Sequence, residues 1–129
     1  MFFEYKLSTS RNDLYNITQQ IHEAIVKSGV TSGIAVVFCS HTTAGITINE
    51  NADPDVVHDL LLGLEKAFPG RADFRHSEGN NAAHLKASAV GLSATVIIDA
   101  SKSESISGAS AFTRDSNRVL FPAYNLDGR

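Results

Sequence analysis

The alternation of hydrophobic and polar positions predicts a strand and then a helix at the start of the chain. Residues 2–9 alternate aromatic or aliphatic side chains with polar ones, which is the two-residue period of a half-buried strand. Apolar positions then recur on one helical face across residues 14–28, after N-cap candidates in residues 10–13 and before the stop signal Gly29. We therefore expect a strand followed by an amphipathic helix.

Two further strands are predicted next. Residues 33–39, GIAVVFC, form a continuous apolar run, which is typical of a strand that is buried on both faces or lies in the middle of a sheet. Residues 44–50, AGITINE, alternate isoleucines with polar side chains, which again favours a strand. Because only SHTT separates the two runs, His41, Thr42 and Thr43 are expected at the end of a central strand.

The second half of the chain is predicted to hold two helices and more strands. Asp53 followed by Pro54 is a helix-start signal, and the apolar face that follows runs to Phe68, before a Pro-Gly pair. A polar loop then leads to a shorter helix with Asn80 or Asn81 as its cap. Strands are expected at residues 93–99, weakly around Ile106, and at 118–126.

The order of these elements indicates the α+β class. Strands and helices do not alternate regularly, which favours a largely antiparallel sheet. The 129 residues suit one domain, and the sequence contains no internal repeat or compositional linker. We predict a single α+β domain over residues 1–129, in which a mostly antiparallel sheet or sandwich packs with two longer helices and one short helix.

The net charge of the chain bears on which classes of partner it can bind. The formal net charge is −3 and no Lys/Arg run occurs, so the basic surface that a nucleic-acid backbone requires is missing. The N-terminal residues introduce charged side chains at once, which is unlike a signal peptide or a membrane-length apolar run. We therefore expect a cytoplasmic protein that binds neither nucleic acid nor membrane.

Three histidines are candidates for chemistry. His41, His76 and His84 lie in loops or at element ends rather than on apolar faces, and neutral imidazole is a common metal ligand. Their spacing matches no short metal motif, so spacing alone does not decide whether they share a metal ion. His84 is expected in the first turn of the short helix, near its positive end.

Acidic, amide and basic residues near these histidines suggest a phosphate site. Asp53 is assigned to helix capping, which leaves Glu50 without a structural task. Residues 79–81 lead into a helix N-terminus, where free amides and the helix dipole favour an anion such as phosphate. Lys86 could add a positive charge one turn further, although an exposed helix lysine needs no function.

Two segments of the sequence resemble a known family. SHTTAGITINENADPDVVHDLL, followed by HSEGNNAAHLKASAVGLSATVII, is similar to the YjbQ family of small trimeric proteins, which are often labelled secondary thiamine-phosphate synthases. The resemblance covers roughly residues 35–98. It implies an α+β subunit, a homotrimer with sites near the subunit boundaries, and a pocket formed by His41 and His84.

The resemblance also implies roles for individual residues. We expect catalysis by His41, His84 and Glu50, and a divalent metal ion, zinc or magnesium, held by His41, His76 and His84. The predicted substrate-binding residues are Thr42, Thr43, Asn80 and Lys86. The implied activity joins a pyrimidine methyl diphosphate to a thiazole phosphate and releases pyrophosphate. One departure is that family members usually carry a GTWQ segment before the last strand, whereas this chain has no tryptophan.

Two functional hypotheses follow. The first is an enzyme that acts on a phosphorylated small molecule through histidine or metal chemistry, with thiamine-phosphate synthesis as the specific reaction. The second is a trimer that binds a metabolite or a metal without turnover, which the missing GTWQ segment favours.

Overall fold

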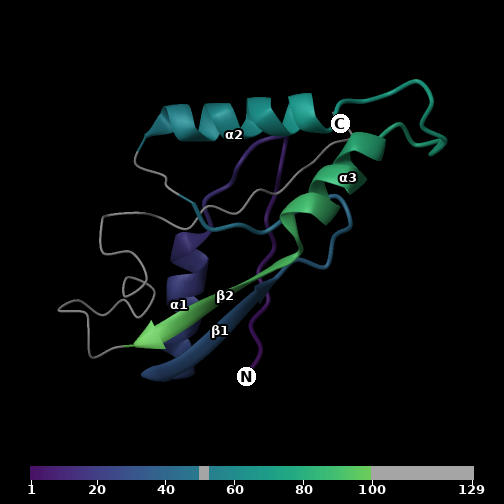
Figure 1. The fold of residues 1–129 in the computed structure, drawn as a ribbon. Helices are drawn as coiled ribbons and strands as arrows, with labels where there is room; N and C mark the ends of the chain where they lie inside the picture. Colours follow the sequence, from purple (N-terminus) through teal and green to yellow (C-terminus); the bar gives the residue numbers. More distant parts are fainter. Residues whose placement is uncertain (50–52, 100–129) are drawn as a thin grey trace.

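A computed structural model describes residues 1–49 and 53–99 of the chain (Figure 1). Its elements, in chain order, are α1 (Thr18–Ser28), β1 (Ser32–Phe38), α2 (Pro54–Ala67), α3 (Asn81–Val90) and β2 (Ser93–Asp99). Three helices with an antiparallel strand pair confirm the α+β class. The strands predicted around Ile106 and at 118–126 lie outside the described residues. No helix within the described ranges is both long and apolar enough to span a membrane.

The strand pair and α1 form the core. β1 and β2 are antiparallel, with Ser32 opposite Asp99 at one end and Phe38 opposite Ser93 at the other. One face of the pair packs against α1, which lies beside the strands in Figure 1. The buried core residues are Ile21, Ile25, Ile46 and Ile98, with Ala35, Val37, Cys39 and Ala94 packed against them. Helix α1 and the sheet therefore bury their apolar faces against each other.

The opposite face of the strand pair is exposed, so the prediction that β1 is buried on both faces is wrong for the described residues. Ile34, Val36 and Phe38 are 66%, 63% and 65% exposed. The register places Ile34 opposite Ile97, which is 53% exposed, so both side chains lie on this outer face. We call Ile34, Val36, Phe38 and Ile97 the outer apolar face.

Two predicted strands are absent from the structure. Residues 1–10 form no strand, and Phe3, Tyr5 and Leu7 are between 37% and 44% exposed. Residues 44–49 form no strand either, although Ile46 is buried as its alternation predicted. The amide of Ile46 donates to the Gly91 carbonyl at 2.9 Å, which is one hydrogen bond rather than the ladder of hydrogen bonds that joins two strands. A strand needs a continuous partner, and within the described ranges neither segment has one.

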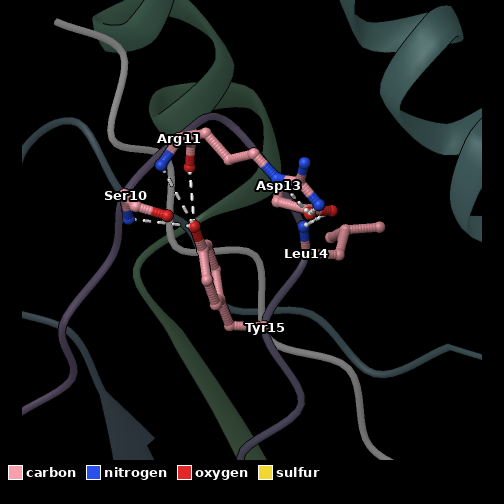
Figure 2. A network of polar contacts seen from close by, with 5 residues as sticks. All are labelled: Ser10, Arg11, Asp13, Leu14 and Tyr15. Atoms are coloured by element: carbon pink, nitrogen blue, oxygen red, sulfur yellow. Dashed lines mark hydrogen bonds and ion pairs between the residues drawn. The ribbon is translucent and has the colours of Figure 1, made fainter. Parts of the chain in front are cut away.

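Helix α1 begins later than predicted because a hydroxyl-centred turn precedes it. Figure 2 shows the Tyr15 hydroxyl accepting from the amides of Ser10 and Arg11, each at 3.3 Å, and donating to the Arg11 carbonyl at 2.8 Å. These bonds fix a non-helical backbone over residues 10–15. The Asn16 side chain then accepts from the Thr18 amide at 3.0 Å, and Ile17 occupies the N-cap position of α1 without a side-chain capping hydrogen bond.

Helix α2 begins as predicted. The Asp53 carboxylate accepts from the Asp55 amide at 2.9 Å, and Pro54 occupies the first helical position. No residue of α2 is fully buried, so this helix packs less closely than α1. The side chain of Leu62 on α2 is 44% exposed.

A close backbone approach joins the segment after β1 to the C-terminal end of α3. The Cys39 amide donates to the Leu92 carbonyl and the Ile46 amide to the Gly91 carbonyl, each at 2.9 Å. Between them, Gly45 is buried, and a Cβ atom placed on it would lie 2.8 Å from Cγ1 of Val90. Only a glycine lets residues 39–46 lie this close to α3.

We predict that Gly45→Ala lowers the free energy of unfolding by about 1–3 kcal/mol, because the added methyl group overlaps Val90 and the backbone near it. Gly63→Ala is the matched control, since nothing lies within 4 Å of its Cβ position. That change in α2 should raise the unfolding free energy by about 0.5–1 kcal/mol. Urea unfolding measures both, and equal effects of the two changes would contradict the close approach.

Candidate functional site

The N-terminal end of α3 presents unpaired backbone donors. Asn80 occupies the N-cap position, but its side chain makes no capping hydrogen bond. Its carbonyl accepts from the Ala83 amide at 3.0 Å, whereas the amides of Asn81 and Ala82 find no acceptor among the described residues. The first turn also contains no acidic side chain. This helix end is therefore a positive site at which an anion is stabilised.

Two of the three candidate histidines lie together beside this helix end. The ring centroids of His76 and His84 are 5.1 Å apart, and the rings meet edge to face at 88°. Gly79, with a φ of 78°, turns the chain back toward α3, and its amide donates to the His76 carbonyl at 3.4 Å. His84 stands in the first turn of α3, as predicted, so the turn brings a loop imidazole to a helix imidazole.

The two imidazoles line an open hollow of about 370 Å³. Its lining residues are Phe74, Arg75, His76, Asn81, His84 and Leu85. Two of them, Phe74 and Leu85, are apolar, and the others offer a guanidinium, two imidazoles and an amide. This combination suits a small ligand that carries both an apolar ring and an anionic group.

Charge pairs beside the hollow involve neighbouring residues of the same loop. Two bonds of 2.9 Å link the Arg71 guanidinium to both carboxylate oxygens of Asp73. They hold the pKa of Asp73 below its usual value, and Asp73 raises the pKa of Arg71. Nε2 of His76 lies 3.7 Å from a carboxylate oxygen of Glu78, which is beyond hydrogen-bond distance. The Arg71 charge is thus neutralised within the loop.

Lys86 is buried, contrary to the expectation of an exposed helix residue. Its side chain is 2% exposed, and its ammonium group is paired with the Glu65 carboxylate of α2. The cause is its place on the face of α3 that also carries Ala83 and Ala87, whose small side chains leave room for the lysine. Lys86 does not line the hollow; it joins α3 to α2.

His41, Thr42 and Thr43 lie elsewhere. The segment that contains them follows β1 and is bonded at both ends to Gly91 and Leu92, beyond the C-terminal end of α3. His84 is seven residues before Gly91, a helical distance of roughly 10 Å. None of the three residues lines the hollow. Their catalytic and substrate-binding roles stay predictions, and Glu50 lies outside the described residues.

The expected metal site is only partly assembled. A catalytic zinc ion takes three protein ligands, and the described residues bring together the imidazoles of His76 and His84 without a third. Across residues 1–49 and 53–99, no group of three or more His, Cys, Asp or Glu side chains could hold a metal ion. The donor set of these residues does not by itself fit a metal centre.

Asn80 supplies an unexpected feature. The residue is 7% exposed, and its amide oxygen Oδ1 is buried without a hydrogen-bond partner in the part of the chain that the structure describes. A buried acceptor left unpaired costs about 1–3 kcal/mol. Oδ1 accepts rather than donates, so it suits a hydroxyl or amino group of a ligand better than a phosphate oxygen. The predicted binding role of Asn80 is therefore more compatible with a hydrogen-bond donor group on the ligand than with a phosphate oxygen.

Sequence reasoning missed four residues at and near this site. Phe74, Arg75 and Leu85 line the hollow, and Glu65 pairs with Lys86. Arg75 could have been noticed because it directly precedes a candidate histidine. Glu65 carried no signal, since its partner is 21 positions away in the chain.

A family model described as UPF0047 protein YjbQ-like matches residues 3–105. Among curated relatives, UPF0047 protein YugU of Bacillus subtilis is 47% identical over 93 residues, which are 71% of this chain and 70% of that protein. A UPF0047 protein of Methanocaldococcus jannaschii is 52% identical over 99 residues, covering 76% and 72% of the two chains. Their names state a family and no reaction.

Solved structures agree with this fold. A YjbQ/UPF0047-family protein of Clostridium acetobutylicum superposes with a TM-score of 0.82 at 45% identity, covering 95% of this chain and 90% of that one. A YbjQ-like protein of unknown function from Sulfolobus solfataricus gives 0.78 at 25% identity, covering 95% and 84%. The similarity therefore supports the α+β fold over nearly the whole chain.

The pairing of Lys86 with Glu65 predicts a measurable coupling. Glu65→Ala should lower the free energy of unfolding by about 1–3 kcal/mol, because it leaves a buried ammonium unpaired. The same change in a Lys86→Met background, where no charge needs a partner, should cost under about 0.5 kcal/mol. Urea unfolding of the four proteins gives the cycle. An equal cost in both backgrounds would show that the pair does not hold α3.

Proposed function

This chain belongs to the UPF0047 family of YjbQ-like proteins, and we propose that it is an enzyme that binds a phosphorylated small molecule beside α3. The observation that carries the proposal is the His76–His84 pair in a hollow that Arg75 and the first turn of α3 also border. Imidazoles that share a hollow with a cation and free amides suit proton transfer next to a bound anion.

The residues at the hollow are proposed to have three roles: contact with a ring, binding of an anionic group, and proton transfer. The apolar side chains of Phe74 and Leu85 would contact a ring, and the amides at the α3 N-terminus would bind an anionic group. His84, fixed on the helix, and His76, on the loop, would donate a proton to the departing anionic group, because imidazole can act as a general acid. Each role needs only groups that lie at this end of α3.

The specific reaction proposed is thiamine-phosphate formation. In that reaction the thiazole nitrogen forms a bond to the methylene carbon of the pyrimidine, the carbon–oxygen bond to the diphosphate breaks, and pyrophosphate leaves with the electron pair. The positive end of α3 suits the departing pyrophosphate, whose negative charge it would stabilise. Roles for His41, Thr42, Thr43 and Glu50, and a zinc or magnesium ion, stay predictions of this proposal, as does a cytoplasmic location.

A non-catalytic binding trimer is the second candidate. It is favoured because His41 does not line the hollow, which therefore contains fewer of the residues expected to act in catalysis. In that case the hollow would bind a phosphorylated metabolite and release it unchanged.

Assembly into a homotrimer is also proposed, on the evidence of the outer apolar face. The four side chains of this face are each more than half exposed and together present on the order of 400 Å² of apolar surface. A stable interface buries about 800 Å² on each partner, so this face would supply roughly half of it. Met1 and Phe2, at 90% and 85% exposed, offer further apolar surface to other copies.

Self-association is tested with an acidic substitution on the outer apolar face. Val36→Asp should shift the protein from trimer toward monomer in light scattering coupled to size-exclusion chromatography, because it buries a charge in the interface. Leu62→Asp is the control, since Leu62 is 44% exposed on α2 and away from this face. A monomeric parent protein would rule out the trimer, and an unchanged trimer in Val36→Asp would rule out this face.

Catalysis is tested with purified protein, a pyrimidine methyl diphosphate and a thiazole phosphate. Parent protein should form thiamine phosphate, and His84→Ala and His76→Ala should each slow it about 10²- to 10⁴-fold. His58→Ala is the matched control, because that imidazole is 70% exposed on α2 and, among the described residues, is paired with its neighbour Asp59. Thermal unfolding confirms that each variant folds.

The outcomes separate the two candidates. Turnover that survives both His76→Ala and His84→Ala would contradict the assignment of the histidines. No turnover in the parent protein, together with stabilisation by the phosphorylated compounds, would favour the non-catalytic trimer.

A further inference from the structure

The arginines of the described residues differ in one respect. Arg11 pairs with Asp13 at 3.0 Å and Arg71 pairs with Asp73 at 2.9 Å, so in each case a carboxylate two positions later neutralises the guanidinium. Two positions after Arg75 stands Ser77, which carries no charge. Within residues 1–49 and 53–99, Arg75 has no ion-pair partner. Its charge is therefore available to a ligand.

Arg75 is also the arginine that borders the hollow. Next to it are the His76–His84 pair and the N-terminus of α3, whose amides at Asn81 and Ala82 lack acceptors in the described part of the chain. Of the carboxylates on the same loop, that of Asp73 is bonded to Arg71, and that of Glu78 is 69% exposed and lies 3.7 Å from Nε2 of His76. Arg75 and Asn81, the first residue of α3, thus both line the hollow at the positive end of this helix.

The lysine expected to bind the anion does not line the hollow in this structure. Lys86 is 2% exposed, and its ammonium group is committed to Glu65 on α2. A permanent positive charge at the hollow must come from another side chain, and Arg75 is the hollow residue that has one.

We propose that Arg75 is the residue that binds the phosphate or diphosphate group of the ligand in this hollow. Its planar guanidinium can donate two parallel hydrogen bonds to phosphate oxygens while the α3 amides donate from the helix end. Phe74 and Leu85 then leave room for a ring beside the anion, so the ligand class is a small ring compound that carries a phosphate or diphosphate. The ligand class rests on the proposed function, and the role of Arg75 does not require turnover.

The test uses pyrophosphate and inorganic phosphate as probes, with isothermal titration calorimetry on the full chain. Arg75→Ala should raise the dissociation constant for pyrophosphate about 10- to 100-fold, because a charge-assisted pair of hydrogen bonds is lost. Arg75→Lys should fall between that variant and the parent, since lysine keeps the charge but not the paired geometry. Thermal unfolding should be unchanged, because the Arg75 side chain is exposed and makes no ion pair in the described residues.

Arg71→Ala is the matched control. It removes the same charge from the same loop, four positions earlier, but from a guanidinium that Asp73 already neutralises. The dissociation constant of Arg71→Ala for pyrophosphate should stay within about 3-fold of the parent value. This result would separate a specific contact by Arg75 from a general loss of positive charge.

Three outcomes would overturn the proposal: no measurable binding of either probe by the parent protein, unchanged binding by Arg75→Ala, or an equal loss in Arg71→Ala. None of these depends on catalysis. Failure of the turnover assay with intact, Arg75-dependent binding would reject the enzyme and keep the site, whereas turnover that is insensitive to Arg75→Ala would keep the enzyme and reject this residue.

Discussion

The burial of the Lys86 ammonium against α2 fixes where α3 lies, and the hollow depends on that helix. A buried ammonium costs several kcal/mol unless a carboxylate compensates it, so α3 must stay within reach of Glu65. The helical period then sets the directions of the preceding residues. Leu85 is turned about 100° from Lys86 around the helix, and His84 about 200°. Burial of Lys86 on one side thus directs His84 and Leu85 to the other, where the hollow is.

Local signals predicted the helices better than the sheet. Asp53 and Pro54 mark the start of α2 because a cap depends only on the next few residues, and the structure contains that cap. An alternating pattern predicts which side chains are buried, and Ile46 is indeed buried. The pattern does not identify the strand with which the segment would pair. Residues 44–49 make a single bond to Gly91 instead of a ladder, because Gly45 lets them pack closely against α3.

Site residues could be predicted from the sequence where residue type and position in an element were enough. They were missed where burial or charge pairing in the folded chain determines the role of the residue. His76 and His84 could be proposed from their loop and helix-end positions, and the Gly79 turn brings them together. The burial of Lys86 could have been inferred from Ala83, which lies three positions before it and therefore beside it on the helix surface. The availability of Arg75 could not, because it follows from charge pairs that only the folded loop reveals.

The two histidines come from parts of the chain that are held differently, and this connects ligand binding to the proposed chemistry. His84 stands on α3, which Lys86 holds from the opposite side, whereas His76 is placed by a loop turn at Gly79. In the proposed complex, a phosphate bound by Arg75 and by the α3 amides would tie that loop to the helix. The separation of the imidazoles would then be fixed by the non-reacting end of the ligand. Binding energy from the anionic group would therefore be used to orient the proton-transfer pair rather than only to hold the molecule.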